Sequence, residues 1–508
     1  MKKYLNLFDF SQKVNYRTEI LSGLTVALAL VPEAIAFAFI AGLSPLTGLY
    51  AAFVMGLVTS ILGGRPGMIS GATGAVAVVI VSLAKQYGVE YVFATVVLAG
   101  ILQMTAGLLR LGKLMRLVPH PVIFGFVNGL AVIIFMSQMS QFKTTDGEWL
   151  TGSTLFIFLG LVLLTMVVIW GLPKLTKAIP ASLAAILLVF GIVFFLGLDT
   201  RTIGDIASIE GTFPPFHIPD LPFTLETLQI IFPYAAIVAG VGLIESLLTL
   251  NIVDEITETR GRGNKEAVAQ GTANILSGLF SGMGGCAMIG QSLINTSNGA
   301  RARLSGIVAA LMLLVFIMFG SSLIEKVPMA ALTGLMIMVA LGTFEWASLK
   351  TFRRMPKSDV LVMVLVTLVT VFLHNLALAV LVGVIISALV FAWDNAKRIR
   401  ARKYIDEEGV KHYEIYGPLF FGSTTLFAEK FDVLNDPDEV VIDFAESRLV
   451  DMSAIEAVNK ITERYNKVGK KLHLKHLSRD CRRLLANADD IIEVNVLEDP
   501  TYKVVVDK

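Results

Sequence analysis

The chain has 508 residues, of which 55% are apolar and 16% charged, and its mean hydropathy is +0.71. About a quarter of the residues in a soluble protein are charged, so this composition excludes a soluble protein. The 42 Lys and Arg residues nearly balance the 41 Asp and Glu residues. This balance excludes a nucleic-acid binder that relies on net positive charge.

Composition changes near residue 394, and this change predicts two domains. We expect a cytoplasmic N-terminal segment over 1–20, a helical polytopic membrane domain over 21–393, a basic linker over 394–411 and a small α/β domain over 412–508. In the last domain the pattern predicts strands over 412–421, 439–444, 471–474 and 502–506, and helices over 452–468 and 479–487.

Apolar runs interrupted by Pro, Gly and charge predict fourteen transmembrane segments. They lie near 21–41, 46–62, 70–84, 92–109, 119–141, 153–172, 180–198, 228–252, 266–281, 286–299, 304–324, 328–343, 358–374 and 376–393. With the N-terminus inside, 24 Lys and Arg residues fall on the inner side and four fall outside, namely Lys85, Lys143, Arg201 and Lys326. This bias predicts a multi-pass protein of the cell (inner) membrane with both termini in the cytoplasm.

A glycine-rich stretch opens the third segment of each seven-segment half, which favours two inverted repeats. Irregular backbone at membrane depth has to line a cavity or be buried in protein, and a short helix that starts there directs its free amides at an anion. The anion site is predicted at Ala72, Thr73 and Gly74 in the first half and at Met288, Ile289, Gly290, Gln291 and Ser292 in the second. The alternative is that these glycines only allow close helix packing.

Two acidic residues lie within predicted spans, Glu33 in the first segment of one half and Glu245 in the first segment of the other. A carboxyl group in the membrane is costly, so it is a candidate for binding H⁺ or Na⁺. The alternative is a protonated carboxyl that only makes hydrogen bonds between helices. Cys286 and Cys481 lie in an apolar and a charged segment and indicate neither a disulfide nor a metal site.

The sequence contains no nucleotide-binding loop, no metal-spaced His/Cys cluster and no nucleophile elbow. We therefore expect no enzymatic activity and no cofactor, apart from Na⁺ as a coupling ion. Without a nucleotide site, a gradient of an ion or of the substrate has to drive transport.

Several phrases together resemble the SulP family of anion transporters, with a C-terminal STAS domain. They are Val31-Pro32-Glu33, Ser70-Gly71-Ala72-Thr73-Gly74, Glu245-Ser246-Leu247-Leu248-Thr249 and Arg303-Leu304-Ser305-Gly306. The resemblance implies oxyanion transport, core and gate subdomains, elevator-like movement and a homodimer. In bicarbonate members a carboxylate and a threonine of the eighth span help to bind Na⁺, and Glu245 and Thr249 match those positions.

The sequence departs from the family pattern at two positions of the predicted site. Glu33 replaces the Gln that many members have, which favours H⁺ coupling, and Gln291 stands where animal members have Arg. In the STAS domain Asp451-Met452-Ser453 resembles a phosphorylatable motif, which makes Ser453 a candidate regulatory residue. The same residues are explained by a helix N-cap at Asp451 or Ser453.

The sequence thus predicts a Na⁺- or H⁺-coupled carrier of sulfate or bicarbonate, with membrane lipid around it and a possible cytoplasmic partner of the STAS domain. Two alternatives stay open. One is an H⁺-coupled carrier of dicarboxylates or nucleobase-like substrates on the same fold. The other is a membrane-anchored STAS regulator that senses anions without moving them.

Overall fold

The computed structural model describes residues 15–111, 118–144, 148–176, 180–206, 211–222, 224–352, 354–373 and 376–477. The chain forms two compact units with a boundary after Val384. The helix expected over 479–487 and the strand expected over 502–506 lie outside the described residues.

Each predicted membrane segment contains a helix. The helices are α1 (Tyr16–Ala41), α2 (Pro45–Leu62), α3 (Gly74–Tyr87), α4 (Val89–Leu108), α5 (His120–Gln138), α6 (Gly152–Leu175), α7 (Ala181–Leu196), α8 (Leu225–Thr257), α9 (Gly263–Leu279), α10 (Ile289–Ser297), α11 (Leu304–Phe319), α12 (Ser321–Glu325), α13 (Met329–Thr343), α14 (Trp346–Thr351), α15 (Lys357–Leu373) and α16 (Leu376–Ala396). Seven helices in the described part of the chain are long and apolar enough to cross a membrane. The short helix α14 was not predicted.

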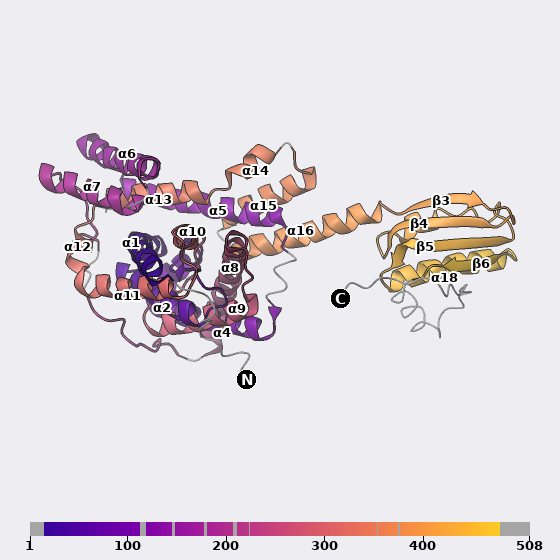
Figure 1. Cartoon of the computed structure of the whole chain (residues 1–508), viewed down its shortest axis with the longest axis horizontal. Helices are drawn as coiled ribbons and strands as arrows, with labels where there is room; N and C mark the ends of the chain where they lie inside the picture. The colour runs from indigo at the N-terminus through magenta and orange to yellow at the C-terminus, as the bar shows by residue number, and fades with distance from the viewer. Residues whose placement is uncertain are drawn as a thin grey trace. The chain divides into compact units, whose positions relative to one another are not determined.

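The helices of the larger unit separate into two groups (Figure 1). Helices α1–α4 and α8–α11 pack mainly on one another and form the core bundle, whereas α5, α6, α7, α13 and α15 form the gate bundle. Within the core bundle the same contacts occur twice when α1–α4 are matched with α8–α11. Helix α4 packs on α9, and α11 packs on α2. Helix α3 packs on α8, and α10 packs on α1. These matched contacts are those expected of two repeats of one helix order.

A two-stranded sheet in the core bundle joins the two halves. Strand β1 (Ser70–Gly71) pairs antiparallel with β2 (Cys286–Ala287), so that Ser70 lies opposite Ala287 and Gly71 opposite Cys286. A glycine is required beside this pairing, because a Cβ at Gly285 would lie 1.9 Å from the Gly71 carbonyl oxygen. Glycine thus allows the two extended segments to meet inside the bundle.

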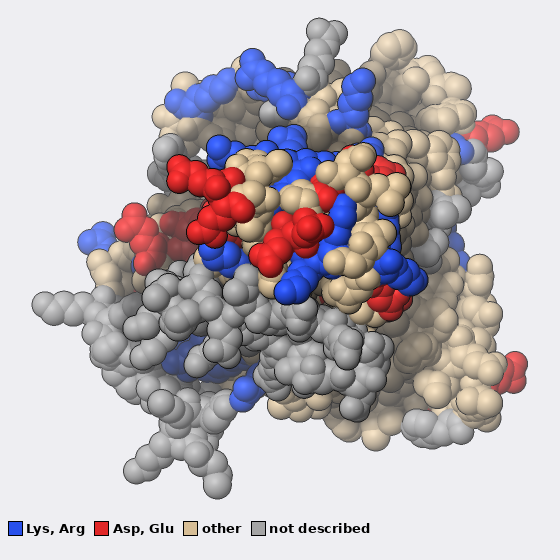
Figure 2. Space-filling view, turned by 90° about the vertical axis from the view of Figure 1, so that its right-hand side faces the viewer, with Lys and Arg blue, Asp and Glu red and all other residues tan. Residues whose placement is uncertain are grey.

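The outer surface of the helical unit carries many large apolar side chains. Phe156, Phe195, Phe319 and Phe372 are all more than 70% exposed. Figure 2 shows broad areas of this unit without charged residues, whereas acidic and basic side chains interleave on the smaller unit. Exposed apolar surface on this scale is typical of helices that face lipid.

The smaller unit has a four-stranded sheet in the order β3-β4-β5-β6. The strands are β3 (Arg400–Ile405), β4 (Lys411–Leu419), β5 (Glu439–Leu449) and β6 (Lys471–Lys475), with helices α17 (Thr424–Ala428) and α18 (Met452–Lys467). Strand β3 is antiparallel to β4, and the other pairs are parallel. The helix at α18 and the strands β4, β5 and β6 were predicted, whereas β3 was missed.

Candidate functional site

The β1–β2 pairing brings the starts of two short helices together inside the core bundle. Helix α3 begins at Gly74 after Thr73, and α10 begins at Ile289 after Met288. Neither helix has a side-chain cap on its first amides. Because the first four amides of a helix have no partner within it, both helices present free N–H groups and the positive ends of their dipoles.

Some of the predicted anion-site residues at the start of α10 make hydrogen bonds to another segment, and one faces open space. The Met288 amide donates to the Ile69 carbonyl at 2.9 Å, and the Ser292 hydroxyl accepts from the Ile69 amide at 2.9 Å. These contacts fix the start of α10 against the segment before β1. Gly290 is exposed, and a Cβ placed there would meet no atom within 4 Å. The first turn of α10 therefore faces open space at Gly290.

The first turn of α3 is more tightly covered. Ala72, Thr73 and Gly74 are buried. A Cβ at Gly74 would lie 2.9 Å from the Phe37 ring of α1 and 3.0 Å from Ile134 of α5. Phe37 and Ile134 thus close over this turn, and Ile134 belongs to the gate bundle.

A chain of polar side chains links the predicted carboxylate Glu245 to the α3 end. The Cys286 thiol donates to a Glu245 carboxylate oxygen at 2.9 Å, and the Thr73 hydroxyl lies 3.1 Å from the Cys286 sulfur. One turn further along α8, the Thr249 hydroxyl donates to the Glu245 carbonyl at 2.8 Å and lies 3.4 Å from the Ala287 carbonyl. The structure therefore brings Glu245 and Thr249 beside β2.

The second predicted carboxylate, Glu33, lies against the first turn of α10. Its carboxyl group interacts with the Gln291 side chain. Gln291 is 1% exposed, and its Oε1 atom has no hydrogen-bond partner among the described residues. A buried amide that lacks one partner is unusual in a folded protein, and it marks a place where a bound group would fit.

Polar side chains behind the strands hold this arrangement. The Asn274 amide donates to Gln103 Oε1 at 2.8 Å and to the Gly285 carbonyl at 3.0 Å, and the Gly285 amide donates to Asn274 Oδ1 at 2.9 Å. Gln270 donates to the Ser70 hydroxyl at 2.8 Å. The bond from Asn274 to Gln103 thus joins α9 to α4, and the bond from Gln270 joins α9 to β1.

Sequence reasoning missed three contributors to the site: Cys286, Phe37 and Gln103. Cys286 was set aside because its spacing suits neither a disulfide nor a metal, yet its position inside the second glycine-rich opening was a usable signal. Phe37 and Gln103 lie on ordinary apolar helices and gave no such signal. The described residues that make these contacts include no Lys or Arg, and the described part of the chain contains no metal-ligand cluster.

The candidate regulatory residue Ser453 is exposed in the first turn of α18. The N-cap is Asp451, whose side chain accepts from the Ala454 amide at 2.9 Å. The other Asp451 carboxylate oxygen accepts from the Phe421 amide at 2.9 Å. The Ser453 hydroxyl is therefore not needed as the cap.

Comparison with known proteins adds independent information. The profile of the sulfate permease family matches residues 16–367, and that of the STAS domain matches residues 404–499. YbaR of Bacillus subtilis, named as a candidate sulfate transporter, is 44% identical over 93% of this chain and 96% of its own. The bicarbonate transporter BicA of a Picosynechococcus species is 31% identical over 88% of this chain and 86% of its own.

Two solved structures resemble parts of the fold. The transmembrane domain of a cyanobacterial bicarbonate transporter BicA aligns with a TM-score of 0.62 and 30% identity, covering 74% of this chain and 98% of that one. The murine anion transporter Slc26a9 aligns with a TM-score of 0.82 and 18% identity, covering 96% of this chain and 90% of that one. The second likeness concerns the fold alone.

Proposed function

The chain belongs to the sulfate permease family and carries a STAS domain, and we propose that it is a secondary transporter of sulfate or bicarbonate. The observation that carries this proposal is the meeting of the α3 and α10 starts, with uncapped amides and open space at Gly290. Amides at helix starts bind oxyanions by hydrogen bonds and by their dipoles. A site without a buried cation also releases its anion readily, as transport requires.

The choice of sulfate or bicarbonate rests on the names of two relatives, YbaR and BicA. Within the site, the anion would lie between Ala72, Thr73 and Gly74 on one side and Ile289, Gly290 and Gln291 on the other. Met288 and Ser292 would support it from behind, because their described contacts run to Ile69.

We assign the coupling cation, Na⁺ or H⁺, to Glu245. This carboxylate lies beside the α3 end through Cys286 and Thr73, and its neighbour Thr249 adds a hydroxyl oxygen. Glu33 is the second candidate through its contact with Gln291. A cation at Glu245 would offset the charge of an anion held nearby, which couples the two binding events.

The separate packing of the core and gate bundles supports an elevator-like movement. The two short helices and both acidic residues belong to the core bundle, whereas Ile134 of the gate bundle covers Gly74. The core bundle could thus carry the whole site past the gate bundle. A homodimer, cytoplasmic termini and control of the STAS domain through Ser453 are further proposals from the family resemblance.

The test is uptake of labelled anions by proteoliposomes that contain the full chain. Sulfate, bicarbonate and a dicarboxylate are compared under an imposed Na⁺ gradient, an imposed H⁺ gradient and neither. We expect uptake of one inorganic oxyanion that one gradient accelerates. Preference for the dicarboxylate would overturn the substrate assignment, and absence of all uptake would favour an anion sensor.

A further inference from the structure

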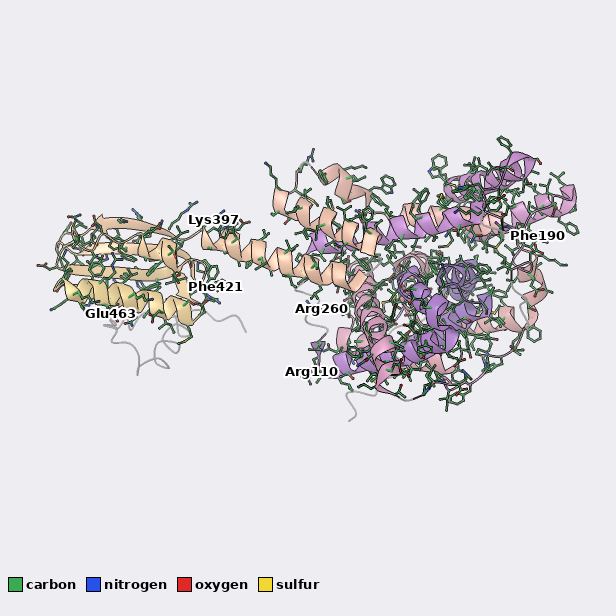
Figure 3. The ribbon with its side chains drawn as sticks, turned by 180° about the vertical axis from the view of Figure 1, so that it is seen from behind. Arg110, Phe190, Arg260, Lys397, Phe421 and Glu463 are labelled. Atoms are coloured by element: carbon green, nitrogen blue, oxygen red, sulfur yellow. The ribbon has the colours of Figure 1, made fainter. Side chains whose placement is uncertain are left out.

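A basic pocket lies at one end of the core bundle, apart from the site at the starts of α3 and α10, which we call the half-helix site. Three turns enclose a pocket of about 400 Å³: the turn after α2, the turn between α8 and α9, and the turn between α10 and α11. Its lining includes six basic residues and no acidic one. They are Arg65, Arg260, Arg262, Lys265, Arg301 and Arg303. Figure 3 shows Arg260 toward the same end of the helical unit as Arg110, with Phe190 toward the other end.

The positive charge of this basic pocket is only partly compensated. Arg65 forms an ion pair with Asp254 at 3.1 Å. In the described part of the chain, the other five cations have no ion pair. Two buried acids lie behind the turns: Glu266 accepts from the Gly64 amide at 2.6 Å, and Glu19 accepts from the Arg301 amide at 2.6 Å. Five of the six cations thus lack an ion pair, and the two buried acids offset only part of their charge.

Hydrogen bonds to backbone carbonyls fix two of the arginines in place. Arg303 donates to the Ser60 carbonyl at 2.9 Å and to the Gly63 carbonyl at 2.7 Å. Arg301 donates to the Thr296 carbonyl at 2.6 Å. These bonds orient the guanidinium groups but do not neutralise them. The pocket is thus preorganised for a ligand rather than formed from freely moving side chains.

The turns that carry the cations are also held together. The Arg262 amide donates to the Gly64 carbonyl at 3.1 Å, and the Gly261 amide donates to Asp254 Oδ1 at 2.9 Å. Arg65 is 6% exposed, and its Nε atom has no hydrogen-bond partner among the described residues. An unsatisfied buried donor beside a basic cavity is an independent sign that an anion belongs there.

The cations of the pocket repel one another, and burial together with this repulsion lowers the pKa of two of them. Burial lowers the pKa of Arg65 from its ordinary value; the charge of Asp254 opposes this effect and the charge of Arg301 adds to it. Burial likewise lowers the pKa of Arg303; the charge of Glu266 opposes this effect and the charge of Arg262 adds to it. An anion with several charges would relieve this repulsion.

We propose that the basic pocket binds an anion that carries two or more phosphate groups. A single sulfate or bicarbonate would neutralise at most two of the excess charges and would leave most of the 400 Å³ unfilled. Arginine recognises phosphate through paired hydrogen bonds, and this pocket has five arginines. The ligand is either a lipid headgroup with several phosphates or a soluble polyphosphate, because the pocket lies at the ends of membrane-type helices.

The first experiment measures binding of inorganic tripolyphosphate to the full chain in phosphatidylcholine nanodiscs at constant ionic strength. Arg260 and Arg262 are exposed, so the double variant Arg260→Gln/Arg262→Gln should keep its fold. We expect it to bind roughly tenfold more weakly or worse, because it loses charge-assisted hydrogen bonds. The matched control is Lys350→Gln/Arg354→Gln, which removes two exposed charges outside the pocket and should bind as the wild type does.

Three results would overturn the proposal. They are no saturable binding, equal weakening in both double variants, and sulfate binding as tight as tripolyphosphate binding. Repeating the titration in nanodiscs with added cardiolipin separates the two sources of the ligand. If a lipid occupies the pocket, cardiolipin abolishes the binding of tripolyphosphate; if the ligand is soluble, binding persists. None of these readouts depends on transport.

Discussion

Asp436 of the α/β unit and the two candidate coupling carboxylates of the core bundle, Glu245 and Glu33, differ sharply in their surroundings. In the α/β unit, Asp436 accepts hydrogen bonds from Lys411, Tyr413 and Tyr465, and its side chain is fully buried. In the core bundle, Glu245 accepts a hydrogen bond from the Cys286 thiol, and Glu33 contacts the Gln291 side chain. Both glutamates are only half-buried. Neither has an ion pair in the described part of the chain.

This difference indicates which carboxylate stabilises the fold and which is available to bind a cation. A buried carboxylate with a cation and two hydroxyl donors has little to gain from a ligand, and it holds three elements together. A half-buried carboxylate with one donor and no ion pair remains able to take up a cation. We therefore expect replacement of Asp436 to damage the fold and replacement of Glu245 to damage function.

The largest effect is expected for Asp436→Ala. It leaves Lys411 without its partner and two buried tyrosine hydroxyls without an acceptor, so the α/β unit should lose about 3–5 kcal/mol of stability. Hydrogen exchange of the β4 and β5 amides in the full chain measures this loss. Asp406→Ala is the control, since Asp406 lies in an exposed turn beside His412, and its effect should be far smaller. Equal effects of both variants would contradict the comparison.

The next effect is expected for Glu245→Gln, which removes the charge while keeping the shape of the side chain. Cation-driven uptake should fall about 5- to 150-fold, the usual range for loss of coupling between two sites. The thermal unfolding temperature should not fall, because no cation in the described structure depends on this carboxylate. Uptake with and without the driving gradient provides the measurement. Unchanged acceleration by the gradient would make the assignment of Glu245 wrong, and Glu33→Gln would then be the variant to test.

The sequence predicted much of this arrangement because the membrane imposes simple rules. Apolar runs located the helices, and glycine-rich openings located the two short helices and their meeting point. Strand β3 was missed because five of its six residues are exposed and its charged sequence shows no alternation. The Asp436 cluster was also missed, since Lys411 and Tyr413 of β4 and Tyr465 of α18 meet only in the folded chain. Contacts between distant segments leave no local pattern.

A smaller effect is expected for Gly290→Ala, which tests the open side of the half-helix site. The added methyl group would meet no protein atom, so any effect on transport arises from the anion itself. We expect the KM for the transported anion to rise several-fold, which corresponds to about 1 kcal/mol.

Gly160→Ala in α6 is the matched control for that variant, because a Cβ there also meets nothing within 4 Å. Both substitutions replace a helical glycine and should stabilise the chain slightly. Only the first should change KM. The same KM in both variants would place the anion elsewhere.

The smallest effect is expected for a change of pH near neutrality, which should leave Asp436 charged and its contribution to stability unchanged. Burial opposes ionisation, but the hydrogen bonds from Lys411, Tyr413 and Tyr465 outweigh it and hold the pKa of Asp436 below its ordinary value. A carboxyl group whose pKa is lower in the folded state stabilises the fold above its unfolded pKa of about 3.9 and loses that contribution as pH falls through the folded pKa. Acid should therefore remove the contribution of Asp436 only below about pH 4.

The difference in β5 amide protection between the wild type and Asp436→Asn isolates this contribution. Both proteins keep the His412–Asp406 and His476–Asp443 pairs, so any contribution of those pairs cancels in the difference. We expect a constant difference from pH 7 to pH 5 and a steady decline as the pH is lowered further. A difference that already shrinks between pH 7 and pH 5 would mean that Asp436 binds a proton near neutrality. Asp436 would then resemble the half-satisfied carboxylates of the core bundle, and the contrast between the two units would fail.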